Sequence, residues 1–197
     1  MNTVTDQAAW MLARGTGVVA LSVFTLALVL GVVARSGRPL AGLGRFGVNE
    51  LHRTAALTGT TLVAVHVGTL MIDPYAQLRW FDAVVPFAGQ FKPLWQGLGT
   101  LAVDLLVVIT VVSLLRHRLG PRVFRAVHWA TYGLWPVAAL HALGNGTDAG
   151  ATWLRVLVGV CTVSVVASVG WRLSGHHRER GRKRTPRTLP RRQGVPA

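Results

Sequence analysis

Two apolar stretches of the sequence, residues 51–72 (LHRTAALTGTTLVAVHVGTLMI) and residues 127–144 (VHWATYGLWPVAALHALG), each contain a pair of histidines. The four are His52, His66, His128 and His141. The spacing is fourteen residues in the first stretch and thirteen in the second. An imidazole in hydrocarbon is costly unless another group uses it, so these four side chains indicate a functional site. Their nearly equal spacing predicts two similar sites at two depths.

The composition around these stretches is that of a membrane protein. Hydrophobic residues make up 51% of the 197-residue chain and charged residues only 14%, and the mean hydropathy is +0.42. Apolar runs of about 20 residues are long enough to cross the hydrocarbon core as helices. Five such spans are expected: Thr16–Ala34, Thr54–Ile72, Gly97–Leu115, Ala126–Gly144 and Thr152–Trp171. Because lipid cannot satisfy free backbone groups, we expect an all-α integral membrane bundle.

The distribution of basic residues predicts the orientation of this bundle. The net charge is +14, and nine of the 21 Lys and Arg residues lie from Arg172 onward. Eight more fall in two loops: Arg35, Arg38, Arg45, Arg53, Arg116, Arg118, Arg122 and Arg125. The alternate loops contain Arg79 and Lys92 alongside aspartates. By the positive-inside rule the N-terminus lies outside a plasma membrane and the C-terminus lies in the cytoplasm. This clustering favours anionic lipid over nucleic acid as the partner of the basic tail.

The span count also suggests how the chain is divided. Residues 1–15 are expected to form an extracytoplasmic segment, and residues 16–172 the transmembrane domain. Residues 173–197 are rich in Arg, Pro and Gly and poor in apolar residues, which predicts a disordered cytoplasmic tail.

The histidine pairs fit the ligation of haem iron by two imidazoles. The second and fourth spans run parallel, because one span separates them. His52 and His128 should therefore lie together near the cytoplasm, and His66 and His141 near the outer side. On an ideal helix, residues fourteen apart differ in direction by about 40° and in depth by about 21 Å. The four histidines are thus expected to be the axial ligands of two b-type haems held between the second and fourth spans.

Residues around the histidines are candidate haem contacts. Gly59 lies midway between His52 and His66, where a missing side chain would let a porphyrin edge approach. Gly133 is the corresponding candidate in the fourth span. Arginines could pair with the haem propionates, although topology or lipid binding is an equally open role for them. They are Arg14, Arg53, Arg122 and Arg125.

Three apolar spans contain other residues that need an explanation. Asp104 lies inside the third span, where a carboxylate is a functional candidate by default, although a hydrogen-bonded packing role is equally plausible. Cys161, the one cysteine, and Trp135 are expected to pack in the bundle. The fourth span also needs a distortion, because thirteen residues leave His128 and His141 about 140° out of phase on a regular helix. Gly133 and Pro136 predict a departure from α geometry near these two residues.

Several short segments resemble the ferric reductase-like transmembrane domain family, the superfamily of NADPH oxidase and ferric reductase membrane domains. The segment at 127–136, with 140–143 and 146–148, resembles the second haem helix of that family. The Leu51-His52-Arg53 and Val65-His66 segments resemble its first haem helix. Leu12-Ala13-Arg14 is similar to the arginine-bearing start of the preceding helix. The histidine spacings are also those of the family, and the resemblance runs from Trp10 to Trp171.

The resemblance implies b-type haem and electron transfer across the membrane, usually outward from the cytoplasm. The oxidases and reductases carry a fused flavin and nicotinamide module after the last span, whereas about 25 residues follow it here. The electron donor is therefore expected to be a separate flavin reductase, a bound flavin or membrane quinol. A similar haem subunit without a fused reductase occurs in the bacterial periplasmic methionine-sulfoxide repair system. Ferric iron, oxygen and an extracytoplasmic flavoprotein are open as acceptors.

Three other functions remain open at this stage. A quinol-linked cytochrome b of another lineage could place four ligands in a comparable bundle, and quinol oxidation would distinguish it. A small transporter could use histidines for metal or proton passage and would show no haem absorption. A purely structural subunit of a membrane complex is the last alternative.

Overall fold

The computed structural model describes residues 3–36, 40, 42–73, 76, 78–146 and 148–174. Within them the chain forms six helices and no strand that pairs into a sheet. They are α1 (Thr3–Ser36), α2 (Arg45–Ile72), α3 (Pro93–Leu114), α4 (Arg116–His128), α5 (Thr131–Asn145) and α6 (Thr152–Leu173). The predicted all-α bundle is confirmed. The tail from residue 175 onward lies outside the described residues, and so does the prediction of its disorder.

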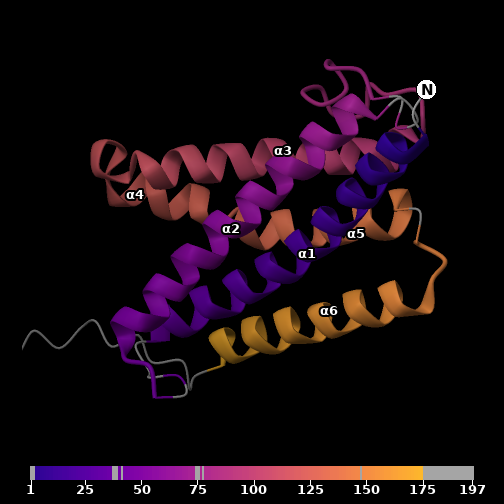
Figure 1. Cartoon of the computed structure of the whole chain (residues 1–197). Helices are drawn as coiled ribbons and strands as arrows, with labels where there is room; N and C mark the ends of the chain where they lie inside the picture. The colour runs from indigo at the N-terminus through magenta and orange to yellow at the C-terminus, as the bar shows by residue number, and fades with distance from the viewer. Residues whose placement is uncertain are drawn as a thin grey trace, which may run out of the picture.

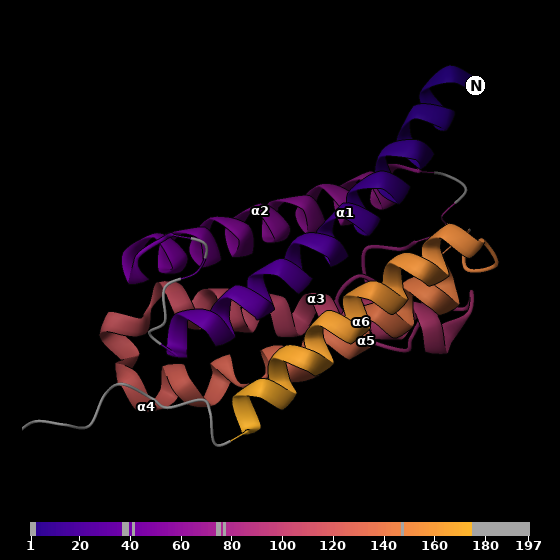
Figure 2. The same ribbon diagram turned by 90° about the horizontal axis from the view of Figure 1, so that it is seen from below.

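The helices pack as two antiparallel pairs with α6 beside them (Figures 1 and 2). One pair is α1 with α2, which contact each other along most of their length. The other is α3 with the consecutive helices α4 and α5, which run back beneath it. The sixth helix packs against α1 and α5. This arrangement places α2 and the α4–α5 segment in one bundle, as the histidine spacing requires.

Four helices in the described part of the chain are long and apolar enough to cross a membrane. They are α2, α3, α6 and the part of α1 from Gln7 to Ser36. The predicted fourth span is divided between α4, of 13 residues, and α5, of 15 residues, so neither reaches this length alone. Together they follow α3 from one end to the other (Figure 1). The predicted fourth crossing, which the broken helix α4–α5 would make, thus remains a prediction.

The break in this crossing lies upstream of the predicted place. Helix α4 ends at His128, Trp129 and Ala130 form a turn, and α5 then continues through Gly133 and Pro136. Three backbone N–H groups in the turn region bond three residues back: Ala130 to Val127, Tyr132 to Trp129 and Gly133 to Ala130. The predicted departure from α geometry is therefore present as a tightening toward 3₁₀ geometry, and it begins upstream of Gly133 and includes that residue. Proline affects the turn before itself, since its ring crowds the carbonyl four residues back.

Three apolar clusters hold the helices together. Leu21, Trp135, Leu154 and Val158 join α1, α5 and α6, and buried Cys161 belongs to the same cluster. Ala27, Leu30, Val48 and Ala55 join α1 to α2, and Leu106, Ile109 and Leu134 join α3 to α5. The Trp135 indole Nε1 donates a hydrogen bond of 2.8 Å to the Thr25 hydroxyl inside the bundle. Trp135 therefore packs as expected, between the two histidine levels.

The first helix extends further than the sequence suggested. It begins at Thr3 and has 34 residues, which corresponds to about 51 Å along its axis. Residue 15, the predicted end of an N-terminal segment, lies within this continuous helix. From Thr3 onward, the segment before the predicted first span is thus part of α1, and Ala13 and Arg14 reach the level of His66.

Candidate functional site

His52 and His128, called the inner pair after their predicted cytoplasmic position, are brought together by α2 and the end of α4. The ring centroids of His52 and His128 are 6.1 Å apart, and the ring planes are at 81°. Two imidazoles bound to one metal from opposite sides have centroids about 6.3 Å apart, if each metal–nitrogen bond is about 2.0–2.1 Å. The observed separation is close to this value. The predicted proximity of His52 and His128 is thus present in the structure.

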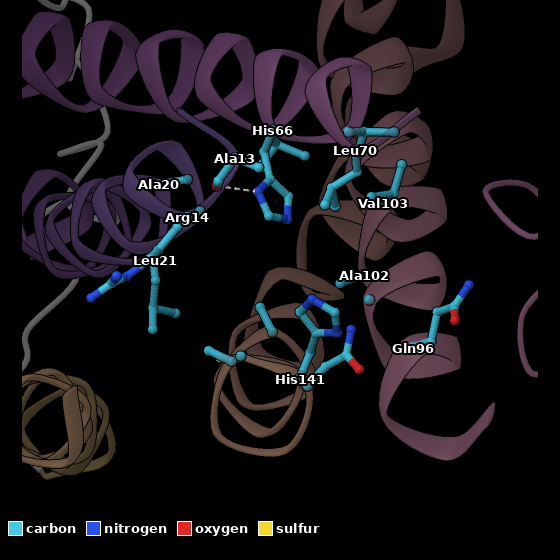
Figure 3. Close-up of a pocket in the computed structure, with 18 of the residues that line it drawn as sticks. Ala13, Arg14, Ala20, Leu21, His66, Leu70, Gln96, Ala102, Val103 and His141 are labelled. Atoms are coloured by element: carbon cyan, nitrogen blue, oxygen red, sulfur yellow. Dashed lines mark hydrogen bonds between the residues drawn. The ribbon is translucent and has the colours of Figure 1, made fainter. Parts of the chain in front are cut away.

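His66 and His141, called the outer pair, face a cavity of about 610 Å³. Figure 3 shows His66 projecting into it from α2 and His141 projecting toward His66 from α5. Side chains of α1 and α3 complete the walls, including Leu21 and Val103. The volume lies in the range of ligand cavities, about 300–1,000 Å³. The cavity is mostly apolar inside, which suits a large flat ligand with few polar groups.

Three of the four imidazoles make the same hydrogen bond. Nδ1 lies 2.7 Å from the carbonyl oxygen of Ala27 in His52, 2.7 Å from that of Ala13 in His66, and 2.8 Å from that of Trp95 in His141. A carbonyl oxygen only accepts, so Nδ1 must carry the proton in each ring. Nε2 then has a free lone pair. This is the tautomer in which histidine binds a metal through Nε2.

His128 differs from the other three. Its Nδ1 atom is buried and has no hydrogen-bond partner among the described residues. The ring stacks on Phe124, with a centroid separation of 5.1 Å and an angle of 26° between planes. His128 is therefore oriented by an aromatic contact and by the end of α4, whereas its partner His52 is oriented by a backbone acceptor.

The outer end of the large cavity is polar. Arg14 pairs with Asp148 and stacks over Trp10, with 4.9 Å from its guanidinium carbon to the ring centroid. Lys92 also lines the cavity. So do Gln96 and Asn145, whose Nε2 and Oδ1 atoms are buried without hydrogen-bond partners in the described chain. Unsatisfied buried polar atoms in a cavity wall indicate a missing polar partner.

The loop between α2 and α3 closes over this end and is held by a buried carboxylate. Arg79 donates to Asp82 from Nε and Nη2, at 3.0 and 2.8 Å. The Thr100 hydroxyl donates to the Asp82 backbone oxygen at 2.7 Å, which fastens the loop to α3. The hydrogen bonds from Arg79 hold the pKa of Asp82 below its ordinary value. The ion pair therefore stays intact at neutral pH and is lost only as the pH falls through that lowered pKa.

The inner end carries a cation over aromatic rings. Arg172, at the end of α6, lies over the Trp129 ring at 4.4 Å and donates a hydrogen bond to the Tyr132 hydroxyl. Trp129 itself is 53% exposed. These three side chains cover the turn that joins α4 to α5 immediately after His128.

The remaining predicted contacts are exposed or face other groups. Arg53, Arg122 and Arg125 are exposed at the inner end, and Arg125 donates to the Pro121 carbonyl oxygen at 3.1 Å. Gly59 is buried against the Phe24 ring, which an added Cβ would meet at 3.0 Å. Gly133 faces open space.

Three glycines at the site were missed from the sequence. An added Cβ would lie 3.0 Å from the His66 ring at Gly17, 3.1 Å from the His52 ring at Gly31, and 2.5 Å from the His141 ring at Gly99. Gly17 and Gly31 are fourteen residues apart, the same spacing as His52 and His66. This matched spacing in the preceding span is the signal that would have found two of the three.

Comparison with known proteins identifies the family. Residues 16–139, more than half of the chain, match the model of the ferric reductase like transmembrane component. The chain belongs to this family of membrane domains, and its role is electron transfer across a membrane. The match contains His52, His66 and His128, and His141 lies two residues beyond its end. No curated protein and no solved structure matches the chain.

Proposed function

We propose that the chain binds two b-type haems, one between His52 and His128 and one between His66 and His141, and carries electrons from the cytoplasmic side to an extracytoplasmic acceptor. The observation that carries the proposal is the set of three imidazoles held by Nδ1 with Nε2 free, two of which form the outer pair and one of which belongs to the inner pair. The family supports transmembrane electron transfer as the setting.

The residues present fit haem. Each pair supplies two neutral imidazoles, and two side chains suffice for a metal that brings its own equatorial ligands. At the outer site an apolar cavity ends in Arg14, Lys92 and the unpaired Gln96 amide, which suits a flat apolar ligand with anionic groups at one edge. Haem iron alternates between ferric and ferrous states and so carries one electron. The protein holds the ligand rings, excludes water and neutralises the acidic edge.

The charges of the two ends support the proposed orientation of the bundle in the membrane. The inner end, where α1 ends, α2 begins and α3 meets α4, exposes seven arginines among the described residues: Arg35, Arg45, Arg53, Arg116, Arg118, Arg122 and Arg125. By the positive-inside rule this end faces the cytoplasm. The loops at the outer end contain the buried acids Asp73 and Asp82. On this proposal the His66–His141 site lies nearer the outside of a plasma membrane.

The decisive measurement is a reduced-minus-oxidised absorption spectrum of the purified protein, combined with a haem-to-protein ratio. We expect non-covalently bound, low-spin b-type haem with a ratio near two, because each iron has two strong-field imidazole ligands. A ratio near one would show that one histidine pair is not a haem site. Protein purified without any haem, from cells supplied with haem precursor, would contradict the proposal.

The arginine-rich inner end should also determine how electrons arrive. Membrane domains of this family commonly work with a separate flavin reductase, and an acidic flavoprotein would be steered toward this face. We expect reduction by reduced flavodoxin, an acidic probe donor, to slow as ionic strength rises. At low salt, the Arg116→Glu/Arg118→Glu variant should be slower by about tenfold.

The control for this experiment lies at the opposite end of the molecule. Arg155 is exposed at the start of α6, remote from the inner face. Replacing it by Glu changes the net charge by the same amount as each of the two inner substitutions. Arg155→Glu should therefore be reduced at the wild-type rate. Equal effects of the inner and outer variants would show that net charge, rather than this face, governs the encounter.

A further inference from the structure

We propose that Gly17, Gly31 and Gly99 are positioning residues, each of which leaves a notch in its helix through which one histidine reaches the carbonyl oxygen four residues earlier. The carbonyls belong to Ala13, Ala27 and Trp95. The inference rests on the proposed haem ligation, and it assigns to α1 and α3 the task of setting the strength of the ligands.

The same geometry occurs three times on two helices. In each case the ring atoms nearest to the glycine are Cε1 and Nδ1, and Nδ1 is also the atom that bonds the carbonyl. The glycine always follows the acceptor residue by four positions. Histidines from two different helices, α2 and α5, use it. Independent repetition of one arrangement indicates that the glycines serve the hydrogen bond.

Helix geometry explains the four-residue offset. The carbonyl of residue i already accepts from the N–H of residue i+4, and a second lone pair remains available. A side chain at i+4 would stand beside that lone pair and block the approach of a ring. Glycine leaves it open. An alanine at Gly17 would place a Cβ 3.0 Å from the His66 Nδ1 and would push the ring away from Ala13.

His128 provides an internal contrast within the same protein. No backbone acceptor meets its Nδ1 among the described residues, and it packs on Phe124 instead. The His66–His141 pair therefore has two ligands with a hydrogen-bonded Nδ1, and the His52–His128 pair has one. A hydrogen bond from the second nitrogen makes the imidazole a more basic ligand, which favours ferric iron. On this account the notches lower the midpoint potential of both haem sites. Two hydrogen-bonded rings contribute at the outer site, and one contributes at the inner site.

The first experiment replaces each glycine by alanine in the full chain. We expect Gly31→Ala to raise the midpoint potential of the inner haem alone, and Gly17→Ala and Gly99→Ala that of the outer haem alone. Gly99→Ala should have the largest effect, because its Cβ would come within 2.5 Å of the His141 ring. Haem affinity at the affected site should fall by about 10–100-fold, the usual cost of losing a partner behind a metal ligand. The readouts are spectroelectrochemical titration and haem transfer to apomyoglobin.

Gly15→Ala on α1 and Gly159→Ala on α6 are matched controls, because an added Cβ has open space at both positions. They should leave both potentials and both affinities unchanged. Wild-type potentials in Gly17→Ala and Gly99→Ala with full haem content would overturn the proposal. Equal shifts in the controls would do the same, since they would show a general response to alanine.

A second experiment does not depend on the folding of the glycine variants. In His66→Ala, purified with imidazole, the free ligand should replace the missing ring. Imidazole can donate its N–H to the Ala13 carbonyl, whereas 1-methylimidazole cannot. We expect imidazole to bind more tightly by about 3- to 10-fold, the net effect of one hydrogen bond. The His128→Ala site, where no acceptor meets the ring among the described residues, should bind the two ligands equally.

The outcomes separate this inference from the proposed function. Absence of haem in the wild-type protein would contradict the ligation itself. Haem binding with equal preference for the two imidazoles at the His66 and His128 sites would retain the ligation and overturn the notch.

Discussion

Replacing His141 by alanine is expected to halve the haem content of the purified protein, from a ratio near two to a ratio near one. His141 lines the outer cavity with His66, and we expect the loss of one of the two iron ligands at this site to release the haem during purification. The haem that remains should be the low-spin inner one, because His52 and His128 are 6.1 Å apart at the other end of α2. The measurement is a pyridine haemochrome assay with a redox titration.

The four single variants also test the pairing. His66→Ala should lose the same redox component as His141→Ala, and His52→Ala and His128→Ala should lose the other. His117→Ala is the control, because His117 is exposed in α4 and takes no part in either pair. Loss of the same component in His52→Ala and His141→Ala would contradict the arrangement of α2 beside α4 and α5.

Replacing Trp135 by alanine is expected to produce the largest loss of stability in the bundle. Its ring lies 6% exposed among Leu21, Leu154 and Val158, and its removal also leaves the Thr25 hydroxyl without its donor. In lipid, helix packing and the cavity dominate the cost rather than transfer from water, so we expect about 2–4 kcal/mol. Trp135→Phe should cost less, because an aromatic ring is kept and the losses are the hydrogen bond, about 1 kcal/mol, and a smaller cavity. Thermal unfolding in detergent measures both.

The same variants decide between packing and electron relay. Trp80, which is 76% exposed in the outer loop, gives a control whose replacement by alanine should leave stability unchanged. In Trp135→Phe we expect electron transfer between the two haems at nearly the wild-type rate, because the helix positions are kept. A large fall in that rate with little change in stability would make Trp135 a redox relay.

Periodicity and spacing were enough to predict the bundle and the meeting of His52 with His128. Both depend on one-dimensional quantities, the length of apolar runs and the phase of residues along a helix. The predicted distortion was centred downstream of the break at Trp129–Ala130. Gly133 and Pro136 indicate that a distortion is present, but they do not show on which side of them it forms. In the structure the turn before the proline absorbs it.

The contacts behind the histidines could not be read in the same way. A backbone carbonyl leaves no mark on the residue that carries it, so Ala13, Ala27 and Trp95 look like ordinary membrane residues. Gly59 shows the opposite problem. Its position between two histidines suggested an approach by a ligand, whereas it faces Phe24 across the α1–α2 interface. Which neighbour fills the space above a glycine is determined by the register of two helices, and that register is a property of the packed pair.

The antiparallel register of α1 and α2 also restricts which insertions and deletions the chain can tolerate. Phe24, halfway between Gly17 and Gly31, meets Gly59, halfway between His52 and His66, so one register serves three contacts. Adding one residue between Gly17 and Gly31 would rotate one notch relative to the other by about 100°. Then α1 could serve only one of the two histidines. An insertion or deletion between Gly17 and Gly31 must therefore be matched by an equal change between His52 and His66.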